Sequence, residues 1–189
     1  VACDVPSHFY CYSFAPNPDW SHRFSPGAEI QAYFEAVAHR YGVDARIQYN
    51  KQVSRCAFEN GRWKIQMSDG SSDVGDVVIA ATGVLHHPAY PDIAGLDSFQ
   101  GQVFHSARWN HDLKLAGKRV GIIGNGSTSA QIVPALIDEV AELSLFQRTA
   151  QWIMPQPNPA YTEQEKAEFR NHSEKMEQLR SDISRLFAD

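Results

Sequence analysis

Residues 118–140 read KRVGIIGNGSTSAQIVPALIDEV, and this stretch decides the fold. Residues 118–123 form a short apolar run typical of a β-strand, and residues 124–129 form a glycine-rich turn. A helix is predicted over 130–140 and a second short strand over 142–146. A strand, a glycine turn, a helix and another strand are typical of a doubly wound α/β fold, which we therefore predict.

The turn matches the fingerprint G-x-G-x-x-G, with Gly124 and Gly126 in the first two places and the small Ser129 in the third. The first glycine permits the tight turn, and the second lets a pyrophosphate approach the backbone at the helix N-terminus. A glycine-rich turn without a ligand is the alternative. The residues predicted to contact a dinucleotide here are Gly124, Asn125, Gly126, Ser127, Thr128, Ser129 and Gln131.

The residues after the second strand indicate which nicotinamide cofactor fits. An NAD site usually places a carboxylate at the end of this strand, whereas an NADP site places an arginine nearby for the 2′-phosphate. The chain has Arg148 and Thr149 there, and Glu142 lies at the opposite end of the strand. Arg148 can bind a phosphate with two parallel hydrogen bonds, so NADPH is predicted; a solvated surface arginine is the alternative.

Two helices are predicted outside this unit. Ser25 and Pro26 have the pattern of an N-cap followed by a first-turn proline, and apolar residues then recur at helical spacing up to Gly42. A last helix begins after Thr162, where Glu165 completes a capping box, and it continues to the end of the chain with one apolar stripe.

Between these helices the pattern changes to strands. Residues 52–67 alternate between apolar and polar around Asn60 and Gly61, which predicts a β-hairpin. Residues 76–81 read DVVIAA, a continuous apolar run that predicts a strand buried on both faces. A proline-containing connection follows this run.

Composition excludes several classes of protein. The 189 residues are 43% hydrophobic and 21% charged, with a net charge of −5, as in an ordinary globular protein without a basic excess for nucleic acid or an anionic membrane. Three cysteines without CxxC spacing predict neither a disulfide framework nor a zinc site. The histidines at 86, 87, 105 and 111 could suggest a metal site, but no cysteine or carboxylate spacing supports one. We therefore expect a reducing, cytoplasmic location and no metal.

A linker segment carries a family resemblance. Phe99, Gly101, His105 and Trp109 match F-x-G-x-x-x-H-x-x-x-W, which resembles the fingerprint of Baeyer–Villiger monooxygenases, whereas Asn110 departs from the Pro or Asp of that family. The related flavin-containing and N-hydroxylating monooxygenases carry Phe or Tyr in place of this tryptophan. The resemblance therefore favours the ketone-oxidising branch and leaves the neighbouring branches open.

Other segments resemble the same family and imply the cofactors FAD and NADPH. The segment with Asp4 and Tyr10 is similar to one that lies against the flavin, and Val53 matches a valine whose backbone meets the FAD adenine. Thr82 belongs to an ATG sequence that is similar to the family's crossing between domains. Residues 146–149 (FQRT) are similar to the family segment that grips the 2′-phosphate of NADPH.

The resemblance implies a partial flavoprotein with two Rossmann-like dinucleotide-binding domains. It divides the chain into part of an FAD domain (1–95), a linker (96–117) and part of an NADP domain (118–189). The family's first glycine turn and its catalytic arginine would lie outside the chain, which opens on Val1 rather than methionine. We therefore expect a piece of a longer protein.

The activity that the resemblance implies is insertion of one oxygen atom from O2 into a ketone, giving an ester or lactone. Asp4 would then orient the family's arginine, and His105 and Trp109 would organise the linker as the NADP domain moves. The alternatives are an acid in a loop for Asp4 and a backbone hydrogen bond for the histidine. N- or S-oxygenation and a non-catalytic NADP-binding module are the rival functions.

Overall fold

The computed structural model describes residues 2–83 and 85–188. The chain divides into two compact units: unit 1 contains residues 1–47 and 116–189, and unit 2 contains residues 48–115. The predicted domain boundaries stay predictions. Among the described residues, no helix is long and apolar enough to cross a lipid bilayer.

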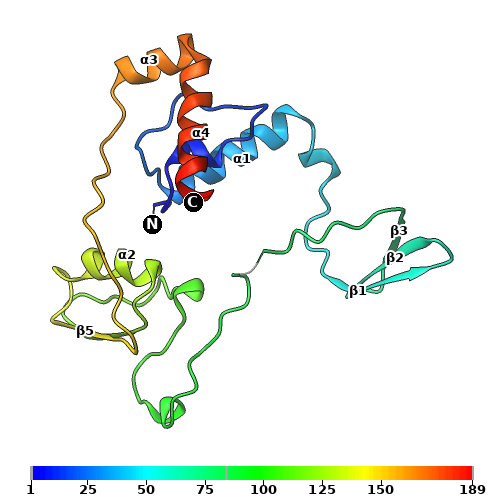
Figure 1. Ribbon diagram of the computed structural model, residues 1–189. Coiled ribbons are helices and arrows are strands. Elements are labelled where there is room, and N and C mark those ends of the chain that lie inside the picture. Colours follow the sequence, from blue (N-terminus) through cyan, green and yellow to red (C-terminus); the bar gives the residue numbers. More distant parts are fainter. Residues whose placement is uncertain (1, 84, 189) are drawn as a thin grey trace. The chain divides into compact units, whose positions relative to one another are not determined.

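Unit 1 contains the predicted strand–turn–helix–strand arrangement (Figure 1). Strands β4 (Arg119–Ile123) and β5 (Glu142–Phe146) are parallel and in register along their whole length, which confirms the α/β prediction. Helix α2 (Ser127–Leu136) connects them and begins three residues earlier than predicted. It also ends earlier than predicted, at Leu136, and its C-cap Ile137 donates its N–H to the Val133 carbonyl.

The helices of unit 1 confirm two predictions and correct two details. Helix α1 spans Gly27–Arg40, but its N-cap is Pro26 rather than Ser25. The serine is fully buried, and its hydroxyl donates to the carbonyl of His22 instead of capping the helix. The predicted last helix is divided at His172, whose backbone is not helical, into α3 (Glu163–Asn171) and α4 (Ser173–Ala188).

The core of unit 1 forms where the N-terminal loop packs against α4. The loop contains the short 3-10 helix η1 (Ser7–Tyr10), which contacts α4. Trp20 is completely buried and donates its indole N–H to the Cys11 sulfur at 3.3 Å. The apolar residues buried in the described part of the chain are Cys11, Ala15, Trp20, Phe24, Leu136, Met176 and Ile183.

One asparagine side chain and one glutamine side chain each join distant parts of unit 1. Asn158 accepts a hydrogen bond from the Phe24 N–H and donates one to its carbonyl, both at 2.9 Å. In the same way, Gln131 of α2 accepts from the Ala2 N–H at 3.0 Å and donates to its carbonyl at 3.1 Å. Each amide thus satisfies both the N–H and the carbonyl of one backbone residue, Phe24 or Ala2.

Unit 2 contains an antiparallel sheet in the order β1 (Val53–Glu59), β2 (Arg62–Met67) and β3 (Ser72–Gly75). Asn60 and Gly61 both have positive φ angles, as a two-residue hairpin of type I′ requires, so the predicted hairpin is confirmed. The third strand was not predicted.

The predicted strand at 76–81 is wrong. These residues lie in no strand or helix, and the side chains of Val77 and Ile79 are 76% and 84% exposed. A strand buried on both faces needs neighbouring strands for its N–H and carbonyl groups and packed layers on both faces. Nothing in the described ranges 2–83 and 85–188 pairs with this segment, so its apolar pattern alone does not make it a strand.

Candidate functional site

The glycine turn lies at the carboxyl edge of the β4–β5 pair. Gly124 has φ +105°, which residues with a side chain rarely adopt, and its N–H donates to the Phe146 carbonyl at 2.9 Å. Gly126 is the N-cap of α2 and has an extended backbone. A Cβ atom built at either glycine meets nothing within 4 Å, so the space over the turn is open.

The start of α2 is suited to a negatively charged ligand. Within the described residues no side chain caps this helix, and its first turn contains no acidic residue. Free N–H groups and the helix dipole therefore favour an anion here. Ser129 is buried and donates its hydroxyl to the Gly124 carbonyl at 2.5 Å, so this predicted cofactor residue braces the turn from inside.

The residues after β5 lie beside the turn because parallel strands end at the same edge. The side-chain amide of Asn125 donates to the Gln147 side-chain oxygen at 2.8 Å and to the Thr149 carbonyl at 2.7 Å. Arg148 lies between these two acceptors, is exposed, and has no ion pair within the described ranges. The structure thus brings a free guanidinium to the edge that holds the glycine turn.

Gln131 is also held by protein groups, because both ends of its amide bond the Ala2 backbone. This pairing places the N-terminal segment against α2. Asp4 is exposed. Burial raises the pKa of the Tyr10 phenol above its ordinary value, and the nearby charges of Asp4 and Cys3 act in the same direction.

Two further predicted residues lie in unit 2. Val53 is the first residue of β1, is paired with Met67 next to a bulge, and is half exposed. Thr82 is exposed and lies in no strand or helix. The residues predicted to bind FAD are therefore divided between the two units, and neither unit alone brings them together.

The linker fingerprint has a local structural basis. His105 caps the 3-10 helix η4 (Ser106–Arg108), because its Nδ1 accepts from the Ala107 N–H at 3.0 Å, which puts the proton of the neutral ring on Nε2. Its backbone N–H donates to the Tyr90 hydroxyl at 3.2 Å. The histidine thus makes the local backbone hydrogen bond that the sequence left open as its alternative role.

The other fingerprint residues are aromatic or lie beside an aromatic ring. Trp109 packs edge-on against Phe104, with 5.2 Å between the ring centroids. The ring of Phe99 lies across Gly101 so closely that a Cβ atom there would come within 2.4 Å of it. In the F-x-G part of the fingerprint, the phenylalanine ring therefore covers the backbone of the glycine, which has no side chain in the way.

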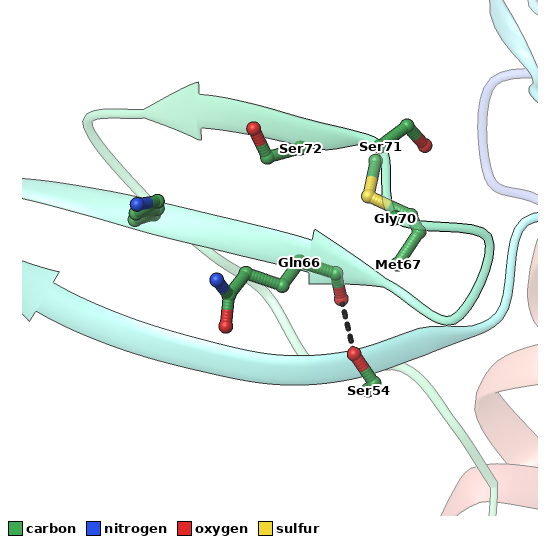
Figure 2. A pocket seen from close by; sticks show the side chains of 7 residues that line it. Ser54, Gln66, Met67, Gly70, Ser71 and Ser72 are labelled. Carbon is green, nitrogen blue, oxygen red and sulfur yellow. Dashed lines mark hydrogen bonds between the residues drawn. The ribbon is translucent and has the colours of Figure 1, made fainter.

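Two shallow hollows lie elsewhere. One, of about 460 Å³, lies on the sheet of unit 2, where Ser54, Gln66, Met67, Gly70, Ser71 and Ser72 are its labelled lining (Figure 2). Its Ser54 hydroxyl donates to the Gln66 carbonyl at 3.1 Å. An apolar hollow in unit 1 lies between the loop with Tyr12 and α1. Neither of these two hollows is lined by a residue predicted to bind a cofactor or to act in catalysis.

Sequence reasoning missed two residues that the structure makes notable. Gln147 holds Asn125, and the only signal for this role is an amide directly after a strand. His8 is 1% exposed, and its ring lies edge-on against Tyr161 and Phe169. Burial and the nearby charge of Arg180 lower the pKa of this histidine to about 4, so it is neutral near pH 7, and no sequence pattern indicated this environment.

Comparison with models of protein families shows to which family the chain belongs. Residues 1–163 match the family model described as flavin-binding monooxygenase-like. The chain belongs to this family. An uncharacterized monooxygenase of Mycobacterium tuberculosis is 50% identical over 162 residues, which are 86% of this chain and 33% of that protein. A Baeyer–Villiger monooxygenase of Streptomyces coelicolor is 49% identical over 168 residues, or 88% of this chain and 32% of that protein.

Solved structures of monooxygenases have the same fold. A cyclohexanone monooxygenase variant from Rhodococcus sp. Phi1, bound to NADP+, has a TM-score of 0.82 at 30% identity and covers 93% of this chain. The alignment covers 35% of that structure. The complex of OTEMO with FAD and NADP has a TM-score of 0.81 at 31% identity, over 90% of this chain and 34% of its own. The chain thus spans about a third of the length of the relatives it matches.

Proposed function

We propose that this member of the flavin-binding monooxygenase-like family acts in an NADPH- and FAD-dependent Baeyer–Villiger monooxygenase. The observation that carries the proposal is the open glycine turn at the N-terminus of α2, with Arg148 beside it at the end of β5. The relatives named as Baeyer–Villiger monooxygenases, and the solved cyclohexanone monooxygenase bound to NADP+, support the same proposal.

The described residues fit NADPH. A side chain at Gly124 or Gly126 would project into the space that a pyrophosphate needs, and the N–H groups of α2 supply positive partial charge there. Arg148 offers two parallel N–H donors to a 2′-phosphate, and the neighbouring Thr149 offers a hydroxyl. With NADPH bound at this edge, the chain orients the adenosine end of the cofactor and holds its charge.

The residues that the resemblance assigns to FAD lie in both units. Asp4 and Tyr10 belong to unit 1, whereas Val53 and Thr82 belong to unit 2. These four residues do not form one binding site within either unit, so we derive no catalytic step from them. The proposal for FAD rests on the family and on the OTEMO structure, which contains FAD and NADP.

The proposed reaction places one atom of O2 beside the carbonyl carbon of a ketone and releases the other as water, while NADPH supplies two electrons. Bound flavin would supply the oxygen chemistry, and the protein would supply binding, orientation and exclusion of water. For this chain we propose that Asp4 orients an arginine, and that His105 and Trp109 keep the linker turn in shape. We also propose a cytoplasmic location and a small-molecule ketone substrate.

Product analysis tests the reaction. The complete protein is purified with its flavin and incubated with NADPH, O2 and separate panels of ketones, amines and sulfides, and the products are identified by mass spectrometry. An ester or lactone heavier than its ketone by one oxygen supports the proposal. Products limited to N- or S-oxides would assign the protein to the neighbouring branch, and NADPH binding without oxidation would indicate a binding module.

The cofactor assignment has its own test in Arg148→Ala. Loss of a charge-assisted pair to the 2′-phosphate is expected to weaken NADPH binding about a hundredfold while NADH binding changes little. The control is Arg119→Ala, because Arg119 is the first residue of β4 and so lies at the opposite end of the two strands from the glycine turn. Equal losses for NADPH and NADH in the Arg148 variant would overturn the assignment.

A further inference from the structure

One side chain of the glycine turn reaches out of the turn. The amide nitrogen of Asn125 donates to the Gln147 side-chain oxygen at 2.8 Å and to the Thr149 backbone carbonyl at 2.7 Å. These acceptors lie on either side of Arg148, 22 and 24 residues further along the chain. A single amide therefore holds the chain before and after the arginine.

The segment after β5 has little else to hold it. The strand ladder ends where the Gly124 N–H donates to the Phe146 carbonyl, and residues 147–149 are exposed and form no strand or helix. In the described part of the chain, the two bonds from Asn125 are the only hydrogen bonds of residues 147–149. Without Asn125, this segment would sample several backbone conformations, and Arg148 would move with it.

We propose that Asn125 is a positioning residue that determines selectivity for NADPH over NADH. It acts through Arg148: by fixing the backbone on both sides, it presents the guanidinium to the 2′-phosphate in one place. Binding then requires less loss of conformational entropy from the protein. This inference rests on the proposed NADPH site and assigns to Asn125 a role toward the protein rather than toward the cofactor.

The chemistry of the amide explains why other side chains would serve less well. An amide NH2 has two donors, one for each acceptor, whereas a hydroxyl has one and a carboxylate has none. Replacement by threonine is therefore expected to keep part of the selectivity. Asn125→Asp would place a negative charge against the Thr149 carbonyl and push the segment away.

The decisive experiment is a double-mutant cycle on the complete, flavin-loaded protein with Asn125→Ala, Arg148→Ala and the double variant. Two probes are titrated by calorimetry: adenosine 2′,5′-bisphosphate, which carries the 2′-phosphate, and AMP, which lacks it. NADPH and NADH are compared in parallel by the rate of flavin reduction. The quantity of interest is the ratio of the affinities for the two probes.

Asn125→Ala is expected to lower this ratio about tenfold, since two neutral hydrogen bonds that order the arginine are lost. In the Arg148→Ala background it is expected to lower the ratio no further, because the group through which it acts is gone. Gln147→Ala removes one of the two bonds without changing the turn and is expected to lower the ratio about threefold. It also keeps the test possible if Asn125→Ala does not fold.

Two results would overturn the inference while the proposed function stands. Asn125→Ala could weaken both probes equally, which would indicate a general effect on the turn. Alternatively, the double variant could lose the product of the two single effects, which would show that Asn125 acts independently of Arg148. If Arg148→Ala itself leaves the ratio unchanged, the NADPH assignment and this inference both fall.

Discussion

Gly124 and Gly126 stand two residues apart in one turn, yet the backbone requires glycine at only one of them. Gly124 has φ +105°, where a Cβ atom strains the backbone, whereas Gly126 has φ −72°, which any residue adopts. Both face open space. The sequence motif does not distinguish the two glycines. In the structure, Gly124 is needed for its backbone conformation, whereas Gly126 leaves space for a ligand.

Alanine variants of the two glycines are expected to differ accordingly. Gly124→Ala should lower the free energy of unfolding by about 1–3 kcal/mol and also weaken NADPH binding. Gly126→Ala should cost less than about 1 kcal/mol in stability but weaken NADPH binding about tenfold, because its methyl group occupies the space of a phosphate. Urea unfolding and calorimetric titration distinguish the two effects. Unchanged binding in Gly126→Ala would count against a ligand over the turn.

His8 gives unit 1 a specific dependence on pH. Burial, and secondarily the charge of Arg180, lower its pKa from about 6.5 to about 4, so the unfolded chain binds a proton more readily than the folded one between these values. Its contribution to stability is complete above pH 6.5 and is lost as the pH falls toward 4, by about 3 kcal/mol in all.

The variant His8→Phe keeps a ring between Tyr161 and Phe169 but cannot titrate. Its free energy of unfolding is expected to change between pH 7 and pH 4.5 by about 2 kcal/mol less than that of the natural protein. Urea titrations of both proteins at the two pH values measure this difference. Identical pH dependence would mean that another group accounts for the acid sensitivity.

At the scale of elements, local sequence patterns correctly predicted those helices and strands that local interactions stabilise. Strands β4 and β5, helix α1 and the hairpin all follow from periodicity and turn residues within a few positions. Residues 76–81 have an equally clear pattern but form no strand, because a strand depends on partners that the pattern does not contain. The bonds of Asn125 were likewise beyond prediction, since they depend on the register of two strands.

The start of α3 gives a test at this scale. The Thr162 hydroxyl accepts from the Glu165 N–H at 3.2 Å, while the Glu165 carboxylate accepts from the Thr162 N–H at 2.7 Å, which confirms the predicted capping box. Thr162→Ala is expected to lower the free energy of unfolding by about 1 kcal/mol, whereas Thr162→Ser, which keeps the hydroxyl, is expected to leave it nearly unchanged. Denaturant unfolding followed by circular dichroism measures both. Equal losses would show that the hydroxyl does not contribute.

At the scale of the whole chain, unit 1 is built from two segments that are distant in sequence. The loop with Phe24 and the segment with Asn158 pair through backbone and side-chain bonds across 134 residues. Tyr161 adds a further backbone bond, from its N–H to the Ser21 carbonyl. Such pairings cannot be predicted from one sequence, because nothing in the sequence around this asparagine indicates which distant residue it will bond.

Asn158→Ala is expected to remove two hydrogen bonds and to speed amide exchange at Phe24, with a loss in the free energy of unfolding of about 2 kcal/mol. Asn17→Ala is the matched control, because the bond that Asn17 makes within the described residues is a local one, from the Asp19 N–H. Hydrogen exchange followed by mass spectrometry measures both variants. Faster exchange near Phe24 in both variants alike would mean that the long-range bond does not protect the loop.

The pairing of residue 24 with residue 158 also sets an order of events during synthesis. Unit 2 is continuous in sequence and is synthesised before the second half of unit 1. At 5–20 residues per second, translation of the intervening 134 residues takes on the order of ten seconds. During that time the nascent loop with Trp20 and Phe24 lacks the segment that bonds it in the folded unit.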